Sequence, residues 1–283
     1  MSVDPALVKE RVEAIRRRLA ASGRDIELVA VTKGFPVDAI RAAVAAGCPM
    51  VGENYAQEVV AKFSELRRAA EAGDGSSEPP VCHGAEPPLL SSGGPRAAEP
   101  PLLSSGGPRG AEPPLLSSGG PRGAEPPLLS SGGPRGAEPP VCHFIGRLQS
   151  NKVRQLAPYV AVWESVDRSS LLAEIAKRAP GATVLIQVNA TGEDGKGGCT
   201  PDEAPRLADE ARRLDLDLDG MMTVGPTSGD PAETAAAFTV VRRLVDSMHL
   251  RTCSMGMSGD IDQAFELGTT RVRIGSAIFG SRT

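Results

Sequence analysis

Short apolar runs alternate with segments of helical periodicity along most of this 283-residue chain. The runs are rich in β-branched residues, which is typical of strands buried in a parallel sheet. They predict eight strands, at residues 27–33, 49–55, 141–146, 161–166, 182–189, 216–224, 250–257 and 271–280. Between the strands, apolar residues recur every three or four positions, which predicts helices, and a further helix is expected at 5–21.

One segment, residues 84–143, interrupts this alternation. It holds four copies of a 13-residue unit that reads GAEPPLLSSGGPR, the second beginning AAE, and a partial fifth copy, GAEPPVCH. Its 60 residues include 14 Pro, 12 Gly and no aromatic residue, so it can bury too little apolar area to offset the entropy of ordering the chain. We expect a disordered, low-complexity tandem-repeat insertion, with a partner-binding array as the alternative.

The motif EPPVCH stands on both sides of the repeat, at 78–83 and at 138–143. Only the second copy continues into FIGRLQSNK, so we expect the third strand to resume at about Val141. The first copy, residues 81–83, is then a displaced duplicate. Because the preceding helix is expected at 54–72, the insertion falls in a helix-to-strand connection.

Without residues 84–143 the chain has 223 residues, enough for one domain with a sizeable core. Eight strands with intervening helices in that length predict a single (β/α)8 TIM barrel spanning 1–283 around the insertion. An open doubly wound sheet is the rival fold, but no GxGxxG turn follows the first strand. In a barrel, helix-to-strand connections lie opposite the active site, where a long insertion does least harm.

Composition narrows the function classes. The net charge is −4 with acidic and basic residues intermixed, which argues against nucleic acid or a membrane surface as partner. The first residues lack the apolar core of a signal peptide, and no run of about 18 apolar residues exists. The five cysteines are odd in number and show no CxxC spacing, so we expect a cytoplasmic protein with reduced thiols and no metal site.

In a barrel, catalytic and binding residues lie at the carboxyl ends of the strands, so candidate site residues are expected there. Lys33 ends the first strand, and a lysine among apolar walls loses proton affinity, leaving an amine able to attack an aldehyde. When VTK is considered by itself, a lysine that extends along apolar surface to solvent is more common than a reactive lysine. Ser258, Gly275 and Ser276 follow the last two strands, where barrels commonly bind phosphate. Ordinary tight turns would explain each of these three positions separately.

Together these segments carry a family resemblance. The chain resembles the pyridoxal 5'-phosphate (PLP) homeostasis protein family, which is related to the barrel domain of alanine racemase, over nearly all residues outside 84–143. The resemblance rests on AVTKGFP, VGENYAQE, HFIGRLQSNK, ESVDR, LIQVNATGEDGKGG, GMMTVGP, SMGMSGD and VRIGSAIFG.

The resemblance implies a site for PLP. Lys33 matches the lysine that forms the Schiff base, and Ser258, Gly275 and Ser276 match phosphate-holding positions. Arg273 matches an arginine near the pyridine nitrogen, where a fixed cation would weaken the ring as an electron sink. Asn54 matches a residue that lines the cofactor, although a helix N-cap explains an asparagine there equally well.

Other positions are secondary or depart from the family. Lys196 matches a lysine linked to further handling of the cofactor, with a solvated loop lysine as the alternative, and Met257 is a second candidate of this kind. Many relatives carry a second lysine two residues after the first, but Phe35 stands here. His143 is expected near the start of its strand, away from the site, in a structural role.

Three functions are consistent with these observations. The leading one is a PLP-binding protein of intracellular PLP homeostasis without major turnover. We expect it to be a monomer and to deliver PLP to PLP-dependent apoenzymes. The competing one is a racemase-like enzyme. We expect no further domain after the eighth strand to supply a catalytic tyrosine, and only Tyr55 is placed to act as the acid. The third is a scaffold built on the repeats.

Overall fold

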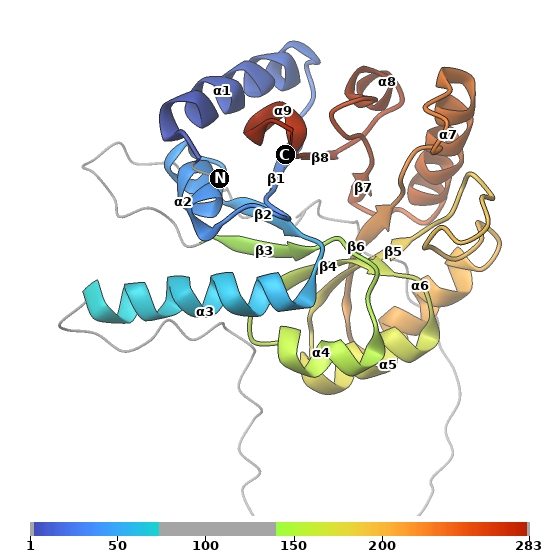
Figure 1. Ribbon diagram of the computed structural model, residues 1–283. Coiled ribbons are helices and arrows are strands. Elements are labelled where there is room, and N and C mark those ends of the chain that lie inside the picture. The colour runs from blue at the N-terminus through green and yellow to red at the C-terminus, as the bar shows by residue number, and fades with distance from the viewer. Residues whose placement is uncertain (1–2, 74–139, 282–283) are drawn as a thin grey trace, which may run out of the picture. The chain divides into compact units, whose positions relative to one another are not determined.

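The computed structural model describes residues 3–73 and 140–281, and within them eight strands form a closed, parallel barrel (Figure 1). Each strand pairs with the next along the chain, and β8 pairs with β1. The strands are β1 (Glu27–Val31), β2 (Met50–Glu53), β3 (Val141–Phe144), β4 (Val160–Val166), β5 (Thr183–Gln187), β6 (Asp217–Met222), β7 (Thr252–Ser254) and β8 (Arg271–Ile274). The helices are α1 (Pro5–Ala21), α2 (Val37–Ala45), α3 (Ala56–Gly73), α4 (Ser150–Leu156), α5 (Ser169–Arg178), α6 (Ala204–Arg213), α7 (Pro231–Ser247), α8 (Ile261–Glu266) and α9 (Ser276–Phe279). The predicted TIM barrel is confirmed.

The helices begin and pack as their sequences dictate. In α1, the Asp4 carboxylate accepts hydrogen bonds from the first-turn N–H groups of Ala6 and Leu7, and Pro5 takes the position that needs no N–H partner. One face of α1 is then buried at intervals of three or four residues, by Val8, Val12, Ile15 and Leu19. Asp230 and Pro231 begin α7 in the same way.

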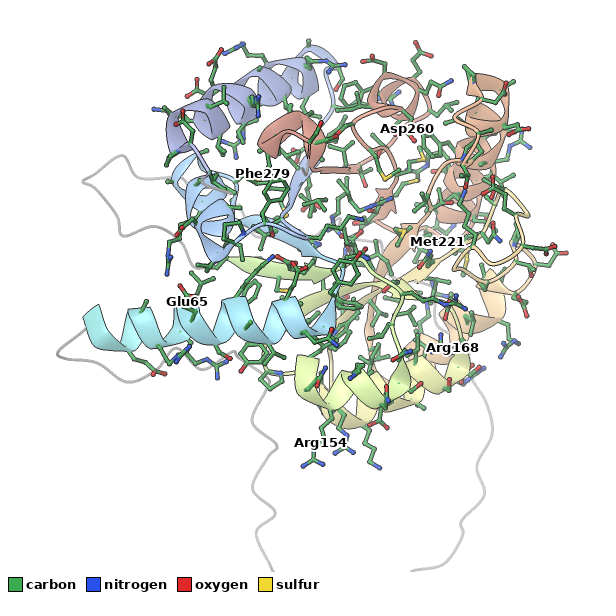
Figure 2. The ribbon with its side chains drawn as sticks, viewed as in Figure 1. Glu65, Arg154, Arg168, Met221, Asp260 and Phe279 are labelled. Carbon is green, nitrogen blue, oxygen red and sulfur yellow. The ribbon has the colours of Figure 1, made fainter. Side chains whose placement is uncertain are left out.

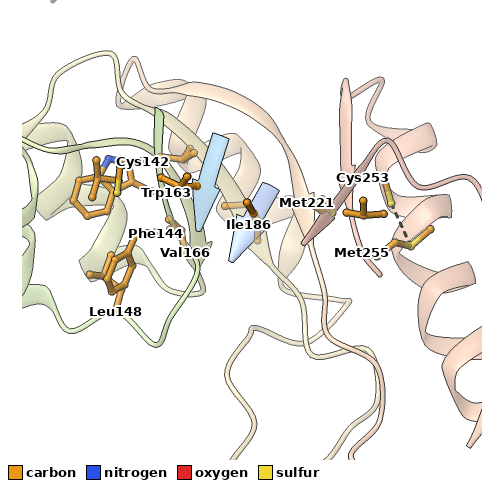
Figure 3. Close-up of a cluster of buried hydrophobic side chains, with 14 of the residues drawn as sticks. Cys142, Phe144, Leu148, Trp163, Val166, Ile186, Met221, Cys253 and Met255 are labelled. Carbon is orange, nitrogen blue, oxygen red and sulfur yellow. Dashed lines mark hydrogen bonds between the residues drawn. The ribbon is translucent and has the colours of Figure 1, made fainter. Parts of the chain in front are cut away.

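The apolar core lies between the strands and the helices around them. Trp163 on β4 and Phe144 on β3 are fully buried there, with their ring centroids 6.4 Å apart (Figure 3). The four cysteines in the described part are buried, unpaired thiols; Cys253 on β7 contacts the Met255 sulfur at 3.6 Å. Burial raises the pKa of the Cys253 thiol to about 12, so this side chain behaves as a small core residue.

Several predicted strands are shorter than expected. The predicted strand at 271–280 divides at Gly275 into β8 and the short helix α9. The strand predicted at 49–55 ends at Glu53, and α3 begins at Ala56. The first helical hydrogen bond of α3 is accepted by Tyr55 O. Asn54 therefore precedes the helix-capping position, and its interpretation as an N-cap is wrong.

The second VCH copy supplies β3, as predicted, and β3 pairs with β2 from Met50 and Val141 onward. The first copy and the repeat up to residue 139 lie outside the described residues, so their predicted disorder stays a prediction. Among the described helices, none combines the length and the apolar character needed to cross a bilayer.

Candidate functional site

The carboxyl ends of β8, β1 and β2 bring the sequence-predicted residues to one end of the barrel. Lys33 lies two residues beyond β1, and Gly275 and Ser276 follow β8 directly. Ala30 pairs with Ile274 in the sheet, so these two strand ends are neighbours. A Cβ on Gly275 would lie 3.3 Å from Val31 O, which shows how closely the β8–α9 turn approaches β1. The structure thus brings Lys33 and the predicted phosphate residues into adjacent loops.

Lys33 occupies a tight turn. Phe35 N–H donates to Thr32 O at 3.1 Å, and Gly34 has a φ of 75°, the combination that a type II turn requires at its third position. Lys33 is half-buried and stands at the second position of this turn. Its ammonium is therefore carried by a short, constrained stretch of main chain.

Phe35 joins the lysine turn to α9. Its buried ring packs against Phe279 at 5.2 Å between centroids, with the planes tilted by 42° (Phe279 is labelled in Figure 2). α9 is held on its other side by Arg11, whose guanidinium donates to Ile278 O at 3.0 Å. The lysine turn and α9 are thereby fixed to each other by an apolar contact.

The loop after β7 completes the predicted phosphate region. Ser258 Oγ accepts a hydrogen bond from Ala277 N–H in α9 at 3.3 Å. Asp260 (labelled in Figure 2) fixes this loop by accepting from Met257 N–H at 2.5 Å. Gly256 adopts a φ of 98°, and a Cβ there would lie 2.6 Å from Ala264 Cβ, so no side chain fits this bend. Hydroxyls and turn N–H groups therefore gather at the ends of β7 and β8, a donor set suited to a phosphate.

Arg273 is almost fully buried inside the barrel. Its guanidinium donates to Ser254 Oγ on β7 at 2.6 Å and to Thr223 O, just after β6, at 2.7 Å. Ser254 Oγ in turn donates to Glu164 Oε2 on β4 at 2.6 Å. The side chain is thus tied to three other strands or their ends, which leaves it little freedom to change rotamer.

His143 belongs to the same network and does not lie near the start of its strand as expected, whereas its structural role stays a prediction. It is the third residue of β3, and its Nδ1 lies 2.6 Å from Glu164 Oε1. Glu164 therefore links His143 to Ser254 and, through Ser254, to Arg273. Sequence periodicity does not predict this network, because its members come from four separate strands.

The charges in this network are set by burial and by their partners. Burial alone would raise the pKa of Glu164, but the hydrogen bond and charge of His143 and the charges of Arg273 and Arg271 lower it to about 2. Burial lowers the pKa of Arg273, against the opposing charge of Glu164. Arginine nevertheless keeps its proton in proteins, so a cation is held at the base of the site at neutral pH.

Asn54 lies half-buried beside the β3–α4 loop. A Cβ on Gly146 would lie 2.0 Å from Asn54 O, so the glycine of HFIG is required for the close approach of the two loops. Tyr55, the next residue, is about half exposed. The other tyrosine, Tyr159, contacts Ser64 Oγ of α3 at 2.8 Å through its hydroxyl.

Lys196 and Met257 lie on the loops after β5 and β7. Lys196 Nζ donates to Gly225 O at 2.6 Å and pairs with Glu193 at 2.7 Å, with only 18% of its side chain exposed. The interpretation of Lys196 as a solvated loop lysine is therefore wrong, whereas its secondary role toward a cofactor stays a prediction. Met257 is a partly exposed side chain on the same loop as Ser258.

A pocket of about 600 Å³ opens where β3 and β4 end. Arg147 and Arg168 line it with Asp167, and Arg168 donates to Asp167 Oδ1 at 2.6 Å (Arg168 is labelled in Figure 2). Two guanidinium groups against one carboxylate give this pocket a positive charge. In an acidic protein, such a local charge favours the approach of a small anion.

One polar cluster beside the lysine turn was not predicted. It consists of Lys62, Glu58, Glu53 and Thr32, and Lys62 Nζ lies within 3 Å of an oxygen of each of the other three. The spacing of Glu58 and Lys62 on α3 is that of an ordinary helical ion pair, so the sequence pattern did not set it apart. In the described part of the chain, no three His, Cys, Asp or Glu side chains are arranged to hold a metal ion.

Comparison with known proteins agrees with this arrangement. The family described as the alanine racemase N-terminal domain matches residues 3–283. The chain belongs to this family. Within the alanine racemase N-terminal domain family, it is 31% identical to the PLP homeostasis protein of Pseudomonas aeruginosa, over 95% of this chain and 91% of that protein. The family resemblance predicted from the sequence is therefore confirmed.

Two solved structures share the fold of this chain. An unknown protein from Bifidobacterium adolescentis superimposes with a TM-score of 0.69 at 31% identity, covering 98% of both chains. PipY from Synechococcus elongatus, in a structure with PLP bound, gives a TM-score of 0.62 at 24% identity and covers 96% of this chain and 100% of PipY.

Proposed function

We propose that this chain binds PLP covalently but reversibly through Lys33 and acts in intracellular PLP homeostasis without major catalytic turnover. The observation that carries the proposal is the direct contact between the lysine turn and α9, through Phe35 and Phe279. This contact supports the proposal because it joins the turn that carries Lys33 to the turn proposed here to bind phosphate. The relative from Pseudomonas aeruginosa, named as a PLP homeostasis protein, supports the same assignment.

Each predicted side chain then has a role toward the cofactor. Gly275 and Ser276, at the start of α9, and Ser258 hold the phosphate, since these turns offer hydroxyl and N–H groups close together and a Cβ on Gly275 would lie only 3.3 Å from Val31 O. Asn54 lines the cofactor from the next strand. Arg273 lies toward the pyridine nitrogen, held there by Ser254 and Thr223.

The chemistry requires nothing beyond the cofactor and the lysine. Bound PLP would supply an aldehyde, and the amine of Lys33 would hold it covalently and reversibly. With the pyridine ring held beside it, the cationic Arg273 would disfavour a proton on the ring nitrogen. The ring is then a weak electron sink, which suits a carrier better than an enzyme that forms carbanions.

A racemase-like enzyme is the alternative function, and it requires an acid or base opposite Lys33. Tyr159 does not meet this need, because its hydroxyl bonds Ser64 on α3 and the Arg67 guanidinium lies 5.0 Å from its ring centroid. Tyr55 follows Asn54 directly and is the remaining tyrosine. Turnover of an amino acid that is abolished both by Lys33→Ala and by Tyr55→Phe would favour the enzyme.

The same proposal places the protein in the cytoplasm as a monomer that passes PLP to apoenzymes. Buried cysteine thiols fit a reducing compartment. Mixing the PLP-loaded protein with a PLP-dependent apoenzyme tests the transfer: the apoenzyme should gain activity faster than it does from the amount of PLP released into solution.

The first test is a visible absorption titration with PLP, followed by borohydride reduction and peptide mapping. We expect an absorption band in the wild-type protein, a label on Lys33, and loss of both in Lys33→Ala. Lys177→Met, on the exposed face of α5, serves as the control and should behave as the wild type. A label scattered over surface lysines, or a band that survives in Lys33→Ala, would contradict the proposal.

A further inference from the structure

The polar cluster of Lys62, Glu58, Glu53 and Thr32 lies directly under the lysine turn. Lys62 Nζ donates to Thr32 O at 2.9 Å, to Glu53 Oε1 at 2.8 Å and to Glu58 Oε2 at 2.7 Å. Only 8% of the Lys62 side chain is exposed, although the residue belongs to a surface helix. All three donor positions of one ammonium are thus used inside the protein.

The contacts fall on both sides of Lys33. Lys62 binds the carbonyl of Thr32, which precedes Lys33, and Glu58 Oε2 accepts from the N–H of Gly34, which follows it, at 2.8 Å. Thr32 also donates through its hydroxyl to Glu53 Oε1 at 2.6 Å. Main-chain groups on either side of Lys33 are therefore held by charged side chains of α3.

Stability alone does not account for this cluster. Glu53 is fully buried, and its second oxygen, Oε2, has no hydrogen-bond partner. A buried ion pair of this kind is commonly no more stabilising than apolar side chains of similar volume. An apolar contact would hold α3 on β1 and β2, but it could not bind the carbonyl of Thr32 and the N–H of Gly34.

We infer that Lys62 and Glu58 are positioning residues that hold the main chain of Lys33 so that its amine meets the aldehyde of PLP. The inference rests on the proposed function. A phosphate held at α9 fixes where the aldehyde carbon lies, and the flexible lysine side chain can reach it reproducibly only from a fixed main chain. The anchors on Thr32 and Gly34 supply that fixed main chain.

The test uses variants of the full-length protein that separate the two anchors. Glu58→Ala removes the acceptor of Gly34 N–H, while Glu58→Gln keeps an oxygen that can accept it. Lys62→Met is combined with Glu53→Gln, so that no unpaired carboxylate is left buried. Lys177→Met is the matched surface control. Three quantities are measured: the rate at which the PLP band appears, the Kd for PLP, and the hydrogen exchange of the Gly34 amide by NMR without PLP.

We expect Glu58→Ala to speed Gly34 exchange and to slow appearance of the band, each by about tenfold, as loss of one hydrogen bond to a charged group implies. Glu58→Gln should recover most of both changes. The Glu53→Gln/Lys62→Met variant should bind PLP at least about tenfold more weakly while it keeps its circular dichroism spectrum.

Two results would overturn the inference. One is a rate and a Kd unchanged from wild type in Glu58→Ala and in the double variant, whatever happens to Gly34 exchange. The other is an equal loss in Glu58→Gln and Glu58→Ala, because the carboxamide retains the acceptor. A wild-type protein without a band on Lys33 would instead refute the proposed function, and the inference with it.

Discussion

Glu164 is the residue on which the charge at the base of the site depends. It lies on β4, yet it contacts His143 of β3 and Ser254 of β7, and its Oε2 is 4.0 Å from Arg273 of β8. Arg271 approaches its other oxygen at 3.7 Å. Glu164 therefore helps to compensate two buried guanidinium groups, of which Arg271 also pairs with Glu27 and Asp219.

Glu164→Gln should lower the unfolding free energy at pH 7 by about 3–5 kcal/mol, because it breaks a buried ion pair from one side. It should also weaken PLP binding by releasing Arg273. Urea unfolding and a PLP titration measure the two effects. Glu13→Gln, a half-exposed carboxylate on α1, is the control and should change neither.

The same side chain predicts a pH dependence. The pKa of Glu164 is about 2 in the folded protein, against 4.5 for an ordinary glutamate. Its contribution to stability is therefore present above pH 4.5 and is lost as the pH falls toward 2, on the order of 3 kcal/mol in total. Urea unfolding of wild type and Glu164→Gln at pH 7, 4 and 3 should show the difference between them shrinking as pH falls. Parallel pH curves would contradict this assignment.

At the residue scale, the sequence predicted the candidate site residues that directly follow strands. It did not predict the buried polar residues that bind the main chain or the side chains of those candidates. Lys33 and Gly275 were predicted because the barrel rule directs attention to strand ends. Lys62 and Glu164 were missed because their partners come from distant elements, and neither helical nor strand periodicity reports such pairs. Lys33 and Lys62 are the same residue type, so amino-acid composition does not distinguish a site residue from a supporting residue either.

At the scale of elements, periodicity located all eight strands, whereas several of their ends were misplaced. The run IGSAIFG is apolar at most positions, and a short apolar run does not distinguish a strand from a helical turn. The structure ends β8 at Ile274 and starts α9 at Ser276, so the backbone turns at Gly275. The site depends on such turns between elements, which the apolar pattern describes least well.

Gly146→Ala tests the close contact of two such loops. The added methyl would overlap Asn54 O, so the β2–α3 and β3–α4 loops must separate. We expect a loss of about 1–3 kcal/mol in the unfolding free energy and weaker PLP binding. Gly259→Ala adds a methyl to open space and should leave the melting temperature unchanged. Equal melting temperatures for both variants would show that the loops adapt without cost.

At the scale of the whole molecule, β2 and β3 pair in the closed barrel although the insertion separates them in the sequence. α3 ends at Gly73 and β3 begins at Val141, so both flanks of the insertion lie at the face opposite the strand ends that carry Lys33 and Gly275. The site residues all come from the described part of the chain. We therefore expect the candidate site to form without the insertion.

Deletion of residues 84–143 should leave fold and PLP binding unchanged. The deletion joins the first EPPVCH directly to Phe144, so the sequence VCHFIG that forms β3 is restored. Circular dichroism and the Kd for PLP are the measurements. Loss of either would show that the repeat contributes to the structure, which would favour the scaffold hypothesis.

The pairing of Met50 with Val141 also has a consequence for how the chain folds. To form this pair, an unfolded chain must close a loop that contains the whole repeat. Removing 60 residues would shorten that loop roughly threefold, which changes the closure entropy by about 1 kcal/mol, since the cost grows only with the logarithm of length. Successive duplications of a 13-residue unit therefore add less and less to the barrier for joining β2 to β3, and a barrel can accumulate them while it still folds.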